Sequence, residues 1–215
     1  MDTHQDTREP LLARLGAWGI LAAVVVFGLS VTVALSHPDT AYVWHLNMIS
    51  DLGDTQCRAR GGRWICSPGY RLFNAGLMAT GILLSLAGAL LIRRWGRVLG
   101  GGVIVMGVGI FVAGIFPAGE TAALHLAGVV LGLVAPGIGL LLSGIRPENA
   151  WLTRWRAARV ILGSGALLFS AESRLPTPLL PQGAGEWLIV VCLLLGLTLE
   201  ALRVLVASRA HPVSR

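Results

Sequence analysis

The stretch NMISDLGDTQCRARGGRWICSPGYRLFN, residues 47–74, is the only long polar interval between the first hydrophobic segment of the chain and the last. It contains Ser50, Asp51, Asp54, two cysteines, four arginines and Asn74. The sequence on both sides of it is apolar and rich in glycine. Much of the side-chain chemistry of this chain is therefore concentrated in one loop between hydrophobic segments.

The composition of the whole chain indicates that a lipid bilayer is its solvent. Of 215 residues, 54% are hydrophobic and 13% are charged, and the mean hydropathy is +0.72. A soluble domain has about a quarter of its residues charged, so the polar surface is too small for a water-soluble globule. The net charge of +6 does not indicate a nucleic-acid partner, because the arginines lie between hydrophobic runs, where topology signals are found.

Six hydrophobic runs approach or exceed the roughly 20 residues that a helix needs to cross a bilayer. They are residues 15–35, 72–92, 98–116, 122–145, 157–171 and 187–208, of which the fifth is the shortest. The sequence predicts an all-α, polytopic membrane protein with a single six-helix transmembrane domain over residues 15–208. The remaining segments are an outer loop over residues 36–71 and tails at residues 1–14 and 209–215.

The end of the first run, Val33-Ala34-Leu35-Ser36, resembles a signal-peptidase site. The run is longer than the 7–15 residues that are typical of a signal h-region, so we expect an uncleaved anchor.

The arginines predict the orientation. With a cytoplasmic N-terminus, 12 of the 17 arginines lie on the cytoplasmic side and 5 on the outer side. This positive-inside bias predicts that both termini are cytoplasmic and that the polar loop is outside, in a protein of the bacterial inner (plasma) membrane.

Two further patterns concern cysteines and glycines. Cys57 and Cys66 do not have the spacing of a tight zinc knuckle, and a disulfide is the simpler interpretation if the loop faces an oxidising compartment. Gly128 and Gly132 have the spacing that lets helix backbones approach closely in lipid. We expect them to pack the fourth run against the third, and a homo-oligomer is possible but not indicated.

Polar side chains gather at the outer ends of the predicted spans. An ionisable group in hydrocarbon costs about 2.5–3.5 kcal/mol on insertion scales, so each needs a reason. We expect a cup open to the outer leaflet, with Asp51, Glu120 and His125 as candidate catalytic residues. The candidate ligand-binding residues are Ser50, Asn74, Glu172 and Glu186.

Each of these residues also has a structural interpretation. Glu120 and Glu186 would be favoured by helix N-terminal dipoles. Asn74 would bond a neighbouring helix, and His125 would be an interfacial histidine with satisfied hydrogen bonds. Asp51 would cap a helix or pair with Arg71 or Arg174. Glu200, three residues before Arg203 near the cytoplasmic side, is interpreted as half of a surface ion pair.

Known cofactor and catalytic motifs are absent from the sequence. It has no glycine-rich phosphate loop, no G-x-S-x-G elbow and no H-E-x-x-H. Only His125 lies within a span, which disfavours a bis-histidine haem. Zinc held by His37, His45, His125 and Asp51 is disfavoured because two of the histidines lie in a loop without fixed spacing. We expect neither a cofactor nor a metal.

Several short motifs carry a family resemblance. They are Ile49-Ser50-Asp51-Leu52-Gly53, Phe73-Asn74, Gly114-Ile115-Phe116-Pro117, His125 and Gly185-Glu186. Together they resemble the six-span domain-of-unknown-function family nine-nine-eight of bacteria and archaea. The I-S-D-x-G loop has a fainter likeness to the eukaryotic Frag/DRAM/Sfk membrane proteins, which are associated with lipid and membrane homeostasis. The resemblance supports the topology and the location of the site but implies no reaction.

Three functions are compatible with these observations. The first is a membrane protein that holds a lipid or other amphiphile in the outer cup. The second is a membrane enzyme that uses a carboxylate and His125 for acid–base chemistry on a lipidic or prenyl substrate. The third is a structural or assembly partner that acts through its glycine-lined helices.

Reporter fusions test the predicted topology. Fusions after Arg97, after Arg156 and at the C-terminus should all report cytoplasm, because these points follow the arginine-rich connections. A periplasmic signal at the C-terminus would contradict the six-span topology.

Overall fold

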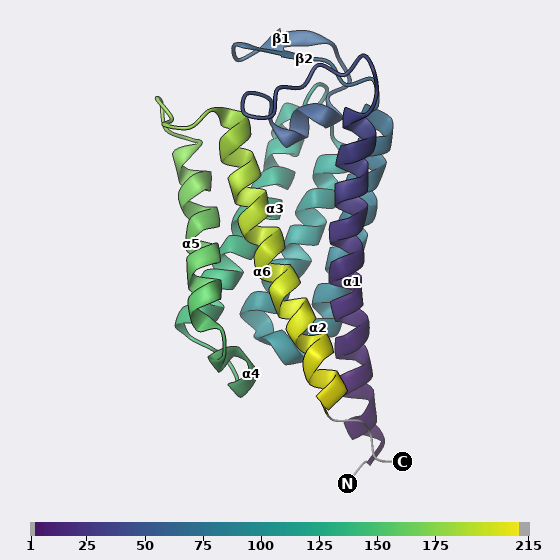
Figure 1. The fold of residues 1–215 in the computed structure, drawn as a ribbon, viewed down its shortest axis with the longest axis vertical. Helices are drawn as coiled ribbons and strands as arrows, with labels where there is room; N and C mark the ends of the chain where they lie inside the picture. Colours follow the sequence, from purple (N-terminus) through teal and green to yellow (C-terminus); the bar gives the residue numbers. More distant parts are fainter. Residues whose placement is uncertain (1–2, 211–215) are drawn as a thin grey trace.

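The computed structural model describes residues 3–210, with side-chain exposure for residues 9–208. Its long helices run side by side in a bundle (Figure 1). The helices are α1 (Thr3–Leu35), α2 (Tyr70–Ile115), α3 (Ala122–Ile145), α4 (Ala150–Thr153), α5 (Arg156–Glu172) and α6 (Gln182–Ala210). The prediction of an all-α fold is confirmed. The expected tail over residues 209–215 lies, apart from its first two residues, outside the described part.

A small cover closes the end of the bundle opposite to the start of α1 and the end of α6 (Figure 1). We use the name cover segment for residues 47–66. It holds the 3-10 helix η1 (Ile49–Gly53) and the antiparallel strands β1 (Arg58–Arg60) and β2 (Arg63–Ile65). The predicted disulfide is confirmed, since Cys57 and Cys66 are joined across the base of this hairpin.

Helix α2 reverses its direction at Gly96, where φ is 73° and ψ is 171°. Only glycine adopts this backbone conformation without strain. A Cβ added to Gly88 would lie 3.0 Å from the carbonyl oxygen of Gly100, so the two halves of α2 pack antiparallel with their backbones in contact. The Glu148 carboxylate accepts hydrogen bonds from the amides of Arg97 and Val98, both at 2.7 Å, and thereby caps the second half.

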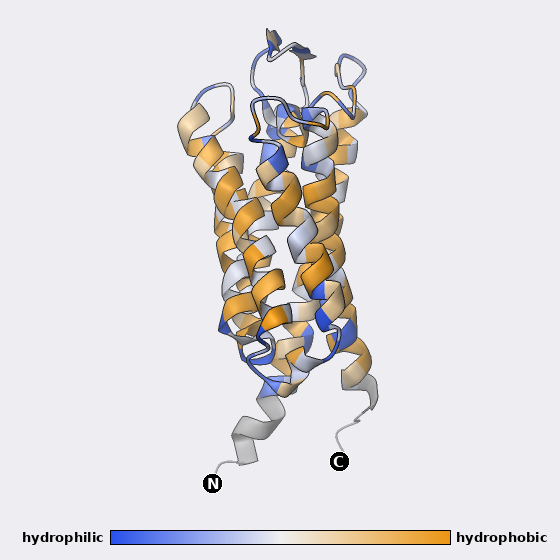
Figure 2. Ribbon diagram, turned by 90° about the vertical axis from the view of Figure 1, so that its left-hand side faces the viewer, coloured by the Kyte–Doolittle hydropathy of each residue, from blue (hydrophilic) through white to orange (hydrophobic). Residues whose placement is uncertain are grey.

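Four segments are long and apolar enough to span a membrane: Glu9–Leu35, Tyr70–Ile115, Ala122–Ile145 and Gln182–Ser208. Figure 2 shows hydrophobic residues along the middle of the bundle and hydrophilic residues toward its two ends. Helix α5 has 17 residues and is shorter than these four segments. The prediction of helices that are long and apolar enough to cross a membrane is confirmed for these four segments.

Glycine-mediated packing joins α2 to α3. A Cβ on Gly128 would lie 2.7 Å from the amide nitrogen of Ala113, and a Cβ on Gly109 would collide with the backbone of Gly132. Helix backbones approach this closely only where side chains are small. The predicted contact between the third and fourth hydrophobic runs is confirmed.

The other end of the bundle holds a buried ion pair that differs from the prediction for Glu200. The predicted ion pair with Arg203 is present at 3.3 Å, but the Glu200 carboxylate is buried and also accepts from Arg159 Nη1 at 2.5 Å. Glu200 is therefore not part of a surface pair. Glu200 lies on α6 and Arg159 lies 41 residues earlier on α5, so their ion pair joins the two helices.

Substitution of Gly96 tests the reversal of α2. We expect Gly96→Ala to lower the free energy of unfolding by about 1–3 kcal/mol, because a Cβ is strained at this φ and ψ. The added Cβ would also lie 2.9 Å from the Glu148 carboxylate. Thermal unfolding of the purified protein in detergent measures the change.

Gly101→Ala is the matched control, since a Cβ at Gly101 has no atom within 4 Å. Equal stabilities of the two variants would contradict the importance of the Gly96 conformation.

Candidate ligand-binding cavity

A cavity of about 640 Å³ lies between α3, α5, α6 and the cover segment. One wall is apolar and includes Leu126, Val130 and Leu133 of α3 and Leu167 of α5. Farther from the cover segment, α3 and α5 approach closely at glycines: a Cβ on Gly163 would lie 2.5 Å from the amide nitrogen of Leu141. The cavity lies at the covered end, where Leu133 of α3 and Leu167 of α5 are among the residues that line it.

A buried ion pair fixes the cover segment above the cavity. Arg63 donates from Nε to Asp51 Oδ2 at 2.6 Å and from Nη2 to Asp51 Oδ1 at 3.0 Å. Arg63 Nη1 also donates to Gln182 Oε1 of α6 at 2.7 Å. Asp51 therefore pairs with neither Arg71 nor Arg174, the partners considered from the sequence. Side chains alternate between the two faces of a strand. In β2, Arg63 and Ile65 lie on the buried face and Trp64 lies on the exposed face.

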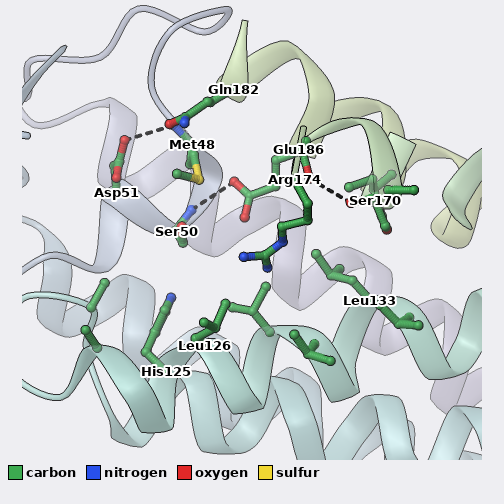
Figure 3. Close-up of a pocket in the computed structure, with 18 of the residues that line it drawn as sticks. Met48, Ser50, Asp51, His125, Leu126, Leu133, Ser170, Arg174, Gln182 and Glu186 are labelled. Carbon is green, nitrogen blue, oxygen red and sulfur yellow. Dashed lines mark hydrogen bonds between the residues drawn. The ribbon is translucent and has the colours of Figure 1, made fainter. Parts of the chain in front are cut away.

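Glu186 provides a second tie between α6 and the cover segment. Its Oε2 accepts hydrogen bonds from the amides of Ile49 and Ser50, the latter at 3.3 Å, and Figure 3 shows this contact beside the cavity. Ser50 and Glu186 both line the cavity. Glu186 thus holds η1 in place while facing the same space.

Tyr42 and Trp187 make a third tie. Trp187 Nε1 donates to the Tyr42 hydroxyl at 2.9 Å. Burial, as the largest cause, raises the pKa of Tyr42 to about 12. The hydroxyl therefore stays protonated at physiological pH, and the contact between the loop and α6 does not titrate there.

His125 presents an unpaired ring nitrogen. Its side chain is 9% exposed, and Nδ1 lies 2.9 Å from the carbonyl oxygen of Phe116 and 3.3 Å from that of Ala113. Since carbonyls only accept, we assign the proton of the neutral ring to Nδ1. Nε2 then carries a lone pair, is buried and has no hydrogen-bond partner within the described residues. His125 lines the cavity, and in Figure 3 its ring is directed into it.

From the sequence, Arg174 is interpreted only as one of the five outer arginines and as a partner for Asp51. It follows the end of α5, and its guanidinium extends into the cavity toward α3 in Figure 3. Among residues 9–208, the Arg174 side chain has no ion pair and no hydrogen bond, whereas Arg63 is paired with Asp51 and Arg60 lies 3.8 Å from Asp54. The sequence feature that could have identified Arg174 as a site residue is its position at the same predicted end of the bundle as Glu172 and Glu186.

The arginines of the cavity lining differ in their pairing. Arg63 is paired with Asp51 and Arg60 lies 3.8 Å from Asp54, which leaves Arg174 as the lining arginine without an ion pair among residues 9–208. The cavity therefore favours a ligand with an anionic group at its polar end.

The other predicted residues lie away from the cavity lining. Asn74 is buried and donates to the Gly53 carbonyl at 3.0 Å, which fastens η1 to α2. Glu172 accepts from the Leu180 amide at 2.9 Å. Glu120 is exposed and lines a neighbouring hollow of about 300 Å³. Of the seven candidates, the structure brings four together, namely Ser50, Asp51, His125 and Glu186.

The enzyme hypothesis needs a carboxylate beside His125, but the His125 ring contacts the backbone carbonyls of Ala113 and Phe116. The reason is local, since the end of α2 turns its last carbonyls toward the first turn of α3. Within the described residues, no group of three or more His, Cys, Asp or Glu side chains is arranged to hold a metal ion.

Comparison with known proteins gives one match. The model of a family described as Protein of unknown function (DUF998) matches residues 20–203. No curated protein and no solved structure matches the chain.

Neutralising Asp51 tests its role as a tie of the cover segment. We expect Asp51→Asn to lower the free energy of unfolding by about 3–5 kcal/mol, because it leaves the buried guanidinium of Arg63 without its counter-charge. Thermal unfolding and trypsin cleavage in the cover segment measure the loss.

Asp39→Asn is the control, since Asp39 is exposed and its side chain makes no described ion pair. Its effect should stay within about 0.5 kcal/mol. An Asp51→Asn protein as stable as the unsubstituted protein would contradict this role of Asp51.

Proposed function

We propose that this chain, which belongs to the family Protein of unknown function (DUF998), binds a lipid or another amphiphile in the cavity between α3, α5 and α6. The observation that carries this proposal is the division of the cavity into two chemical ends. Leu126, Val130 and Leu133 form an apolar wall, while His125 and Arg174 lie at the covered, polar end. An amphiphile has the same division, with a hydrocarbon part and a polar headgroup.

The proposed topology has six membrane crossings with both termini in the cytoplasm. The two halves of α2 supply two crossings because the chain reverses at Gly96. Helix α5, with 17 residues, has a length of about 25 Å at 1.5 Å per residue, which is close to the roughly 30 Å of the hydrocarbon core. The positive-inside bias of the arginines supports an outer location for the cover segment. The cavity then lies at the level of the outer leaflet of the cell membrane.

The geometry favours binding over acid–base chemistry. Asp51 is neutralised by Arg63, and Glu186 is engaged by two backbone amides. An acid–base pair needs a carboxylate within hydrogen-bond reach of the histidine, and His125 instead contacts the carbonyls of Ala113 and Phe116. The contacts of these three residues hold the cavity in shape.

Filling the cavity tests the proposal. We expect Leu126→Trp to reduce several-fold the amount of lipid that co-purifies with the protein, because Leu126 lines the cavity and an indole would occupy the space of the hydrocarbon part. Native mass spectrometry together with lipid extraction of the purified protein measures this amount.

Leu124→Trp is the matched control. Leu124 is 47% exposed and Leu126 is 44% exposed on the same helix, but Leu124 does not line the cavity. Equal lipid retention by the two variants, or no retained amphiphile in the unsubstituted protein, would contradict the proposed function.

A further inference from the structure

We infer that the ligand of this cavity is a phospholipid with a net negative, hydroxyl-bearing headgroup, whose phosphate is held by Arg174 and whose hydroxyl donates to His125 Nε2. This inference rests on the proposed function, because it specifies the headgroup of the amphiphile. Its basis is the pairing pattern of the polar side chains that face the cavity.

Arg174 is the cation that is available to a ligand. The guanidinium of Arg63 is already engaged by Asp51 and Gln182, and that of Arg60 lies near the buried carboxylate of Asp54. Arg174, in contrast, has no side-chain partner within residues 9–208 and extends across the cavity in Figure 3. A guanidinium donates two parallel hydrogen bonds to a phosphate, so a phosphate group matches both its charge and its geometry.

His125 supplies an independent observation that indicates a donor on the ligand. With its Nδ1 proton directed to the Phe116 and Ala113 carbonyls, Nε2 can only accept. This nitrogen is buried and unpaired within the described residues, and buried polar atoms in proteins nearly always have a partner. A hydroxyl near the phosphate would supply that partner, whereas a quaternary ammonium has no hydrogen to donate.

The unpaired guanidinium of Arg174 separates anionic from zwitterionic headgroups. Arg63 is paired with Asp51 and Arg60 lies near Asp54, so Arg174 is the lining arginine without an ion pair among residues 9–208. A headgroup with one net negative charge offsets the charge of Arg174, whereas the ammonium of a zwitterionic headgroup opposes it. The polar end therefore favours a phosphoglycerol-type headgroup over a phosphocholine.

The apolar wall selects the source of the phosphate. Leu126, Val130, Leu133 and Leu167 continue from the polar end along α3 and α5. A free phosphate ester would leave this wall in contact with water, while an acyl chain would cover it. The ligand is therefore a lipid and not a soluble phosphate.

The test uses the full chain purified in detergent. The protein is mixed with equal amounts of phosphatidylglycerol, phosphatidylcholine and diacylglycerol that have identical acyl chains, and bound lipid is counted by native mass spectrometry. We expect retention of phosphatidylglycerol to exceed that of diacylglycerol about tenfold, because only the phospholipid accepts the charge-assisted hydrogen bonds of Arg174. It should exceed retention of phosphatidylcholine several-fold, because only phosphatidylglycerol has a headgroup hydroxyl for His125 Nε2. In Arg174→Gln the preference over diacylglycerol should fall to about twofold or less, with diacylglycerol retention unchanged.

Two variants serve as controls. Arg174→Lys keeps the charge and should keep most of the preference. Arg71→Gln removes an exposed arginine at the start of α2 that does not line the cavity, and it should behave like the unsubstituted protein.

The remaining outcomes contradict the inference in distinguishable ways. Equal retention of all three lipids by the unsubstituted protein would overturn the headgroup assignment and leave the proposed function standing. Retention of none would overturn both. Displacement of phosphatidylglycerol by glycerophosphoglycerol at similar concentration would identify a soluble phosphate ester as the ligand and overturn the assignment to a lipid. The preference of the unsubstituted protein is measured independently of the folding of any variant.

Discussion

The buried pair between Asp51 and Arg63 is the interaction on which the covered end of the molecule depends. It joins η1 to β2, and Arg63 continues to Gln182, so one guanidinium connects the loop, the hairpin and α6. The buried charges of Asp51 and Arg63 are tolerated because the guanidinium donates two hydrogen bonds to the carboxylate. The Cys57–Cys66 disulfide closes the hairpin that carries Arg63 and thereby limits where Arg63 can lie.

The sequence was sufficient to predict the helices, since their hydrophobic runs are long and polar residues separate them. It also predicted the contact of Gly128 and Gly132 with the preceding helix, because small residues at this spacing are selected for close approach. It predicted a turn between the second and third hydrophobic runs, at residues 93–97, but not that the helix reverses at the single residue Gly96. A glycine among arginines is compatible with a loop of any length, and the direct reversal depends on Glu148, 50 residues away in the chain from Val98.

The sequence predicted where the site lies but not which residues form it. Residues at the ends of the spans were expected at one end of the bundle, and Ser50, Asp51, His125 and Glu186 do share a cavity. Whether a side chain faces this space depends on the rotation of each helix and on the path of the loop, which one sequence does not contain. Asn74 is therefore turned toward the Gly53 carbonyl, and Glu172 toward the Leu180 amide. Arg174 became visible as a cavity residue only in three dimensions.

The reversal of α2 also bears on how the chain stays in place once it is inserted. Arg93, Arg94 and Arg97 surround the turn at Gly96, so the two halves form a hairpin with three charges at its tip. Moving the tip through the hydrocarbon would cost about 2.5–3.5 kcal/mol for each arginine. The cost for the whole tip is thus close to the stability of an entire small domain. In the proposed topology, this hairpin enters the bilayer from one side, and its charged tip does not pass through to the other.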